Sequence, residues 1–170
     1  MNNLEKYLKK LGACKEARKW AASYSTLQEV WDACENGSWM LWLVAKRAGG
    51  AAWSDERKPV LAAALDCAET VKHLWPEKSA ARIAGAVDVL RQWIAGTASI
   101  ERAKEAREKL KAAAADAYAA AYAAYAAAYA AYAAYAADAA DAADAARLQK
   151  LKECAAIVRA HFPVMEMEGA

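Results

Sequence analysis

The chain has 170 residues, a formal net charge of +2 and 58% hydrophobic residues. Its near-neutral charge lacks the basic excess of nucleic-acid binding proteins, and its most apolar run, residues 39–45, is too short to span a membrane. Residues 1–6 contain no apolar signal segment, so the sequence predicts a cytoplasmic protein with neither a membrane nor a nucleic acid as partner.

The length favours one domain over residues 1–163, followed by a flexible tail over 164–170. The four cysteines are widely spaced, and no pair of Cys or His residues has the spacing of a zinc site. We therefore expect four reduced thiols, no metal and no cofactor.

Hydrophobic residues recur with helical spacing from the N-terminus onward. They predict a first helix over residues 4–11, stopped near Gly12, and a second over 13–22. Thr26 is expected to begin a third helix, because its hydroxyl and Glu29 three residues later form the capping-box pattern.

Further helices follow, separated by glycine and proline. Ser38 is expected to cap a helix over residues 39–45, which is apolar on every side and so indicates a buried central helix. The next helix starts within residues 54–59, since proline is tolerated in a first turn, and ends before Pro76. Another ends at Gly96.

Tryptophans are expected to furnish much of the core, with residues 39–44 the most buried part of the chain. Two of them, Trp20 and Trp93, each end a helix that is followed by a Ser or Thr cap, at Thr26 and Ser99. This faint internal repeat, with an offset of 73 residues, indicates two similar helical hairpins. The expected core tryptophans are Trp20, Trp31, Trp39, Trp42, Trp75 and Trp93.

Residues 99–162 contain no glycine or proline and have a helical pattern throughout. One helix of that length would extend about 90 Å, which is too long for a domain of this size, so we expect at least one break. Aspartate favours the start of a helix. The aspartates at 138, 141 and 144 therefore suggest that one helix ends and another starts near residues 136–141. The last helix is expected to bury one stripe: Leu148, Leu151, Ala155, Val158 and Phe162.

Residues 112–146 consist of 25 Ala, 6 Tyr and 4 Asp. Alanine has the highest helix propensity, so the tract predicts a long alanine-rich helix. Five tyrosines alternate at spacings of four and three, as in a heptad seam. The seam is interpreted as core; the alternatives are a ridge that docks a protein partner or a seam that pairs two chains in a homodimer. The seam residues are Tyr118, Tyr122, Tyr125, Tyr129 and Tyr132.

Tyr135 does not continue the alternating spacing of the seam. It begins a series spaced by three residues, which continues with Asp138, Asp141 and Asp144, and such a series winds around the helix. A tyrosine outside the seam is hard to keep buried, so these four residues form our candidate docking face for a protein partner. One metal ion fits them poorly, because three aspartates at this spacing splay by roughly 120° around a helix.

The sequence carries no motif of enzymatic chemistry. Gly49 and Gly50 lack the downstream Lys-Ser/Thr of a phosphate-binding loop, and there is no GxSxG or HExxH motif. His73 and His161 each precede a proline near a helix end, without a partner motif. We therefore expect no catalytic residues.

Five segments carry a family resemblance. They are residues 12–20, 35–43, 93–100, the Ala/Tyr/Asp tract over 112–146, and residues 154–159. These segments resemble a bacterial family of immunity proteins, which are small, all-helical and alanine-rich and occur in toxin or phage settings. The resemblance implies a cytoplasmic protein that binds and silences a cognate toxin, and it defines no functional residues.

Together, these observations predict a single all-α domain, a bundle or array of about seven or eight helices. The leading function is a non-enzymatic binding protein, an immunity protein that neutralises a cognate bacterial toxin by occlusion. The alternative is a structural or self-assembling helical protein, such as a phage component, whose tyrosine seam forms a dimer. An enzyme with a site dispersed over several helices is a third hypothesis.

Overall fold

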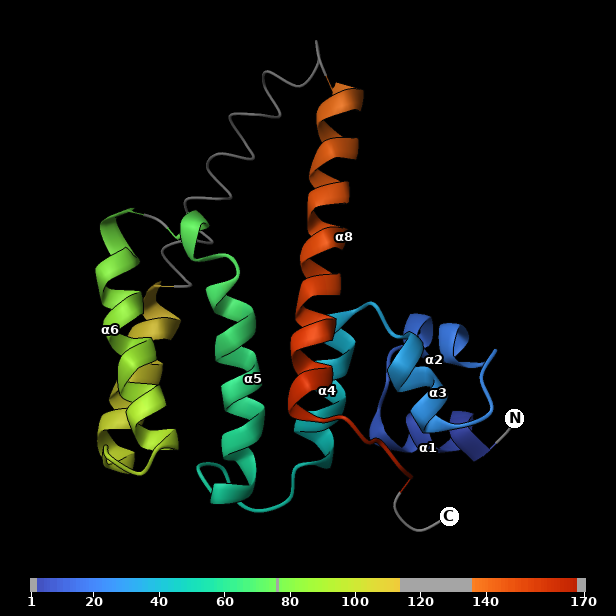
Figure 1. Cartoon of the computed structure of the whole chain (residues 1–170), viewed down its shortest axis with the longest axis horizontal. Helices are drawn as coiled ribbons and strands as arrows, with labels where there is room; N and C mark the ends of the chain where they lie inside the picture. Colours follow the sequence, from blue (N-terminus) through green and yellow to red (C-terminus); the bar gives the residue numbers. More distant parts are fainter. Residues whose placement is uncertain (1–2, 76, 114–135, 168–170) are drawn as a thin grey trace.

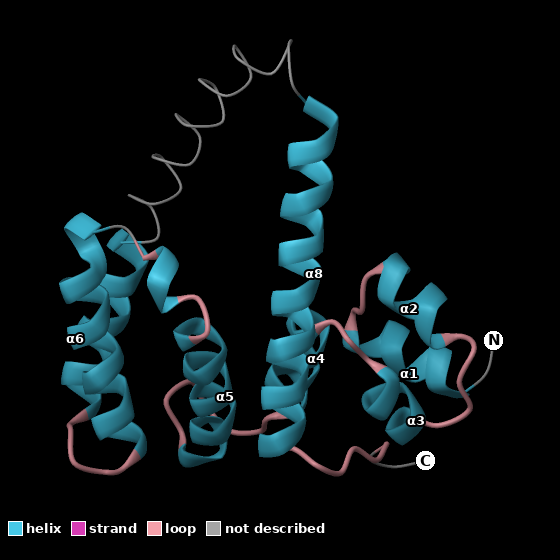
Figure 2. Cartoon of the chain, turned by 45° about the horizontal axis from the view of Figure 1, so that its top comes forward, coloured by secondary structure: helices cyan, strands magenta, loops and turns pink. Residues whose placement is uncertain are grey.

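The computed structural model describes residues 3–75, 77–113 and 136–167, and within these ranges it contains helices and loops but no strand (Figures 1 and 2). This confirms the predicted all-α fold. The helices are α1 (Asn3–Leu11), α2 (Lys15–Ala21), α3 (Leu27–Ala33), α4 (Gly37–Arg47), α5 (Lys58–Glu69), α6 (Glu77–Ile94) and α8 (Ala136–His161). A further helix covers residues 100–113, and the 3₁₀ turns η1 (Asp55–Arg57) and η2 (Lys72–Leu74) flank α5.

Buried side chains form two apolar clusters that share helix α5. The first joins α1 to α5 with α8, and includes Trp31 and Val158. The second joins α5, α6 and residues 100–113, and includes Leu90. Within α5, Cys67 belongs to the first cluster and Leu65 to the second. Helix α5 therefore holds the two halves together, as its place between α6 and α8 shows (Figure 1).

The C-terminal part of α8 lies at the centre of the first cluster, where it packs on α4 and α5. Ala155 and Val158 have no exposed surface, which confirms the middle of the predicted stripe. Leu148, by contrast, is 57% exposed. Its predicted burial is wrong, because the cover that α4 and α5 provide does not reach this turn of α8.

The expected tryptophan core is only partly correct. Trp31 and Trp93 are buried, with 1% and 7% of their surface exposed. The other four are half-buried: Trp20, Trp39, Trp42 and Trp75. Helix α4 buries Gly37, Met40, Leu43 and Val44, as expected for a central helix, but Trp39 and Trp42 on it stay half-buried.

The helix starts follow local capping chemistry. Thr26 Oγ1 accepts a hydrogen bond from the Glu29 amide and Glu29 Oε2 accepts one from the Thr26 amide, both at 3.1 Å, which confirms the capping box. Helix α4 is capped by Asn36, whose Oδ1 accepts from the Trp39 amide at 3.2 Å, and not by Ser38 as predicted. Asparagine caps as well as serine, and this start brings Gly37 into the helix.

Gly37 lies where the first turn of α4 meets α8. A Cβ atom at this position would stand 2.4 Å from Cys154 Cβ and 2.8 Å from the Ala155 backbone nitrogen. No side chain fits in that space, so the close approach of α4 and α8 requires glycine.

Residues 162–167 pack along α3 and α4 after α8 ends. Trp31 Nε1 donates to the Phe162 carbonyl at 2.8 Å, and the Met165 amide donates to Gln28 Oε1 at 2.6 Å. Met165 is 4% exposed, and Arg47 donates to the Glu166 carbonyl. Hydrogen bonds with α3 and α4, which the sequence pattern does not reveal, therefore hold these residues in place, and the flexible tail over 164–170 stays a prediction.

The stretch over residues 99–162 is not one straight helix. Its described portions, residues 100–113 and α8, run in opposite directions at different places in the fold (Figure 1). Residues 136–141, where a break was predicted, are helical, and the chain that precedes them lies outside the described residues.

The predicted hairpin repeat has a structural counterpart. Ser99 Oγ accepts a hydrogen bond from the Arg102 amide at 3.3 Å, as Thr26 does from the third residue of α3. The two corner tryptophans differ in burial, since Trp93 is buried and Trp20 is not. The two segments therefore share the way in which a helix starts, but their tryptophans do not pack in equivalent environments.

Candidate functional site

The candidate face inferred from sequence lies at the edge of the described chain. Asp138, Asp141 and Asp144 belong to α8, but their side chains, like Tyr135 and the tyrosine seam, lie outside the described residues. This end of α8 extends beyond the ends of α4 and α5 (Figure 1), and the side chains of residues 145–149 are exposed. A docking role for these residues remains a prediction.

Four half-buried aromatic side chains lie close together away from this end of α8. They belong to α2, to the turn after α2, and to α4. The Trp20 ring centroid lies 5.0 Å from that of Tyr24 and 6.0 Å from that of Trp39. Trp42 lies one turn after Trp39 on α4 and lines the same recess as Trp20 and Trp39. We call Trp20, Tyr24, Trp39 and Trp42 the aromatic surface.

The three tryptophans of the aromatic surface line a small apolar recess. The recess has a volume of about 40 Å³ and is floored by side chains of the first cluster, among them Leu8, Val30 and Met40. A small-molecule pocket usually has several hundred Å³, so this space accepts the tip of one side chain and no cofactor. Helix α2 has only seven residues, which leaves the rings covered on one side alone.

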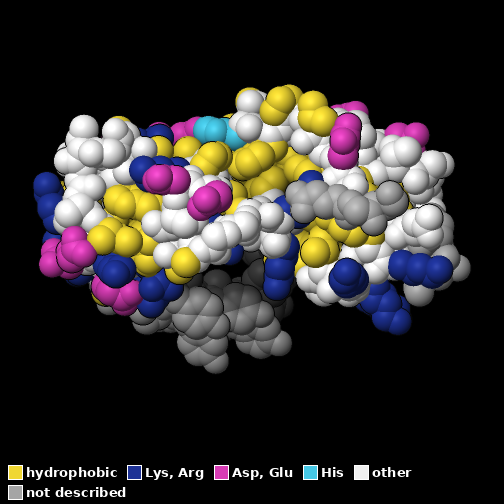
Figure 3. Space-filling model, turned by 90° about the horizontal axis from the view of Figure 1, so that it is seen from below, with side chains coloured by type: hydrophobic (Ala, Val, Ile, Leu, Met, Phe, Trp, Pro, Cys, Tyr) yellow, Lys and Arg dark blue, Asp and Glu magenta, His cyan; other side chains and the backbone are white. Residues whose placement is uncertain are grey.

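The helices that carry the aromatic surface also carry basic side chains. Lys46 Nζ lies 6.0 Å from the Trp42 ring centroid, in reach of a cation–π contact. Lys19 is exposed next to Trp20 on α2. On the face of the molecule seen from below, Lys and Arg side chains gather at the edge of the α1–α3 end (Figure 3). Helices α1 and α2 carry two glutamates and six basic residues: Lys6, Lys9, Lys10, Lys15, Arg18 and Lys19.

Sequence reasoning assigned Trp20, Trp39 and Trp42 to the core, made no prediction for Tyr24, and so missed the surface. One signal was available in the sequence, namely that α4 has apolar residues all around it. Trp39 and Leu41 point to different sides of the helix, so at most one of them can face α8. The second signal is the lysine-rich α2, whose Trp20 lies between Lys19 and Ala21 in a helix of two turns.

A polar network joins α5, α6 and α8 at the opposite side of the first cluster. Arg91 Nη2 lies 2.7 Å from Asp66 Oδ1 and 2.9 Å from Glu69 Oε2, and His161 Nε2 lies 2.7 Å from Asp66 Oδ2. Both oxygens of Asp66 are thus engaged, each by a different helix. The arrangement is a cross-link between helices, and it gives His161 the carboxylate partner that the sequence did not reveal.

The network sets the protonation of Asp66. Partial burial by itself raises the pKa of Asp66, but the hydrogen bonds and charges of Arg91 and His161 outweigh it and hold the pKa below its usual range. The same contacts, led by the hydrogen bond to Asp66, raise the pKa of Arg91. Asp66 therefore stays ionised in the folded protein at neutral pH.

Replacing Asp66 is expected to change how stability depends on pH. The folded pKa lies below the unfolded value of about 3.9, so the stabilisation by Asp66 is fully present above that pH and is lost as the pH falls through the folded pKa. Asp66→Asn is expected to cost about 1 kcal/mol at pH 6 and much less at pH 2.5. Urea unfolding at both pH values measures this, and a constant loss would contradict it. Asp88→Asn, at an exposed position on α6, is the control.

The cysteines show no sign of a reactive thiol in the core. Burial, together with the neighbouring Cys154, raises the pKa of the Cys67 thiol to about 12, and burial also raises the pKa of Cys34. Cys67 and Cys34 therefore stay protonated at neutral pH. Within residues 3–75, 77–113 and 136–167, no group of three or more His, Cys, Asp or Glu side chains is placed to hold a metal ion.

Comparisons with known proteins give no relative. The chain matches no protein-family model, no curated protein and no solved structure. Among the described residues, no helix combines the length and the apolar character that crossing a membrane requires. What the fold defines is an all-α protein with an aromatic surface on α2 and α4, and membership of the immunity-protein family stays a prediction.

Proposed function

We propose that the protein is a non-enzymatic binding protein that docks a protein partner on its aromatic surface. The observation that carries the proposal is a group of four half-buried aromatic residues, in which the Trp20 ring contacts Tyr24 and Trp39, and Trp20, Trp39 and Trp42 line a recess of about 40 Å³. Trp and Tyr dominate the energetic centres of protein interfaces, because a rigid ring buries a large area at little cost in conformational freedom.

The charges around the aromatic surface define the kind of partner. Exposed Lys46 lies 6.0 Å from the Trp42 ring centroid, exposed Lys19 precedes Trp20 on α2, and helices α1 and α2 carry an excess of basic residues. Complementary charge speeds association and selects among partners. The proposed partner therefore presents an apolar side chain for the recess, surrounded by acidic residues.

We further propose that the protein is an immunity protein. It would act in the cytoplasm, where it silences a cognate bacterial toxin by covering the toxin's functional surface. The support for this proposal is the sequence resemblance, since the resembling segments 12–20 and 35–43 contain Trp20, Trp39 and Trp42. The four cysteines are free thiols, which suits a reducing compartment.

The test uses the tagged full-length chain in the cells that encode it. The wild type is expected to co-purify one protein at near-equal stoichiometry, and the double variant Lys19→Glu/Lys46→Glu to recover about tenfold less of it, because the variant repels acidic groups. The partner alone is expected to stop growth. Co-expression of the wild type restores growth, and co-expression of the double variant does not.

Lys78→Glu/Lys109→Glu is the matched control, because it makes the same two charge reversals at exposed positions, on α6 and on the helix over residues 100–113. Equal recovery of the partner with the double variant would contradict docking on the aromatic surface. Loss of the partner in Asp138→Asn/Asp141→Asn/Asp144→Asn alone would instead select the face predicted from the sequence. Recovery of only a stable dimer of the chain would contradict the proposal and favour self-assembly.

A further inference from the structure

A second concave site lies in the other half of the molecule, between α5, α6 and residues 100–113. Its volume is about 390 Å³, which falls in the range of small-molecule pockets. Its walls are leucines from all three helices, including Leu61, Leu90 and Leu110, together with Trp53 and Trp93. The pocket is independent of the aromatic surface, which belongs to the first cluster.

Trp53 forms one wall of the pocket in an unusual backbone conformation. It is the one non-glycine residue of the described ranges with a positive φ, +70°, a region that bulky L residues rarely adopt. Its ring packs edge-on against Trp93, with centroids 5.4 Å apart. Strained backbone of this kind persists where the surroundings hold it and clusters at ligand-binding positions.

Two guanidinium groups line the otherwise apolar pocket. Arg57 donates from Nη2 to the Ala48 carbonyl at 3.3 Å, while its Nε is buried and has no hydrogen-bond partner among the described residues. A guanidinium offers five donors, and Arg57 uses one of them for Ala48, so others are left for an acceptor in the pocket. Arg107 Nη1 donates a hydrogen bond to Glu108 Oε1 at 3.2 Å. Because a guanidinium offers five donors, Arg107 also has donors available for a ligand.

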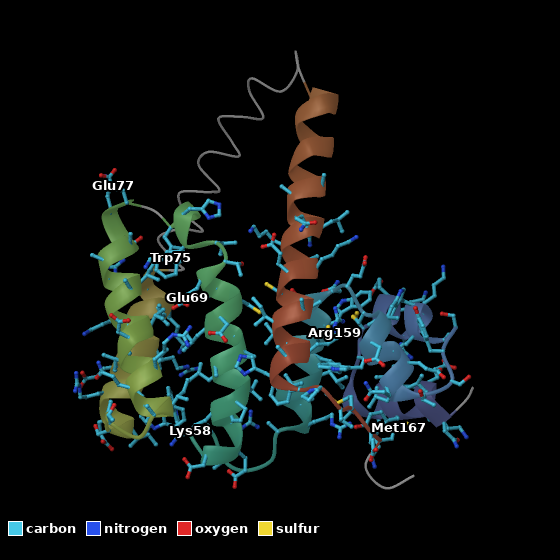
Figure 4. The ribbon with its side chains drawn as sticks, viewed as in Figure 1. Lys58, Glu69, Trp75, Glu77, Arg159 and Met167 are labelled. Carbon is cyan, nitrogen blue, oxygen red and sulfur yellow. The ribbon has the colours of Figure 1, made fainter. Side chains whose placement is uncertain are left out.

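A further positive charge, Lys58, lies near Trp93, which is one wall of the pocket. Lys58 lies at the lower end of α5, on the side of α6 (Figure 4), with Nζ 5.3 Å from the Trp93 ring centroid and 2.7 Å from Asp55 Oδ1. Asp55 balances Lys58, and Glu108 is shared between Arg107 and Lys111. Arg57, which lines the pocket, has no carboxylate partner among the described residues.

We propose that this pocket binds a small amphipathic carboxylate, such as a medium-chain fatty acid, with its chain among the leucines and tryptophans and its carboxylate on Arg57 and Arg107. The apolar walls account for the chain, and a carboxylate supplies an acceptor for the donors of Arg57 and Arg107 that their printed bonds leave free. A guanidinium binds a carboxylate through parallel, charge-assisted hydrogen bonds. A neutral chain of the same length would leave these donors unpaired.

The test titrates the full-length protein with decanoate and with decanol, both below the concentrations at which they aggregate. Calorimetry gives the affinity, and the indole N–H signals in NMR spectra, assigned with Trp53→Phe and Trp93→Phe, give the place. Decanoate is expected to saturate one site and to shift the Trp53 and Trp93 signals. Decanol is expected to bind about tenfold more weakly, because it lacks the charge-assisted bonds.

Arg107→Gln and Arg57→Gln are expected to weaken decanoate binding about tenfold and to leave decanol binding unchanged. Arg107 is exposed, so its variant tests the proposal even if Arg57→Gln fails to fold. Arg102→Gln, at an exposed position on the same helix outside the pocket, is expected to bind like the wild type. No saturable binding, equal binding of decanol, or shifts confined to Trp20 and Trp39 would each overturn the proposal.

Discussion

Arg159→Met is expected to lower the free energy of unfolding by about 2–4 kcal/mol. Arg159 reaches from α8 to the end of α3, where its Nη1 donates to the carbonyls of Cys34 at 2.7 Å and Trp31 at 3.1 Å. Figure 4 shows Arg159 on the C-terminal part of α8. Methionine keeps the unbranched apolar stem but leaves both carbonyls without this donor, and it removes a positive charge that favours the C-terminal end of α3.

The matched control is Arg147→Met, on the exposed part of the same helix. Urea unfolding followed by circular dichroism measures both variants, and Arg147→Met is expected to stay within about 0.5 kcal/mol of the wild type. If the two variants lost similar stability, the effect would come from the charge of α8 and not from the bonds to α3.

Gly37→Ala is expected to destabilise the protein by about 1–3 kcal/mol, although alanine is the better helix former. The added methyl group would overlap Cys154 Cβ and the backbone of Ala155. Backbone atoms cannot rotate away as a flexible side chain can, so α4 and α8 must separate at this point. The contact between the two helices would then weaken along its length.

Gly85→Ala, in the middle of α6, is the opposite case. A Cβ atom there meets nothing within 4 Å, so the helix propensity of alanine is expected to stabilise the protein by about 0.4–1 kcal/mol. Thermal unfolding of the two variants should therefore shift in opposite directions. A shift of Gly37→Ala to higher temperature would show that α4 does not lie as close to α8 as described.

Local chemistry explains why much of the fold could be predicted from the sequence. The capping box at Thr26 and the helix that ends before Gly96 depend on residues a few positions apart. Their hydrogen bonds form within one turn of helix, so the pattern contains all the information. The same holds for Ser99, which bonds the amide of Arg102.

Contacts between distant segments explain the errors. The cap of α4 is Asn36 and not Ser38, and Gly37, now the first residue of α4, packs against Cys154 and Ala155 more than 100 residues away. Met165 is buried by Gln28 and its neighbours for a similar reason. Hydrophobic periodicity shows which side of a helix is apolar, but not whether another helix arrives to cover it.

The same limit applies to the candidate sites. Trp39 and Trp42 fit a buried helix by composition, and only the position of α8 shows that they stay half-buried. Composition pointed instead to Tyr135 and the aspartates after it, because that tract differs most from an ordinary globular sequence. The pocket beside Trp53 has no signal in the sequence, since its walls come from three helices and one loop.

Hydroxyl-radical footprinting of the complex with its co-purified partner tests the central claim most directly. The oxidation of each tryptophan is compared between the free and the bound protein. We predict that Trp20, Trp39 and Trp42 are protected in the complex, while Trp75, which is also half-buried but lies near α6 (Figure 4), is oxidised equally in both. Unchanged oxidation of the aromatic surface in a stoichiometric complex would contradict the account.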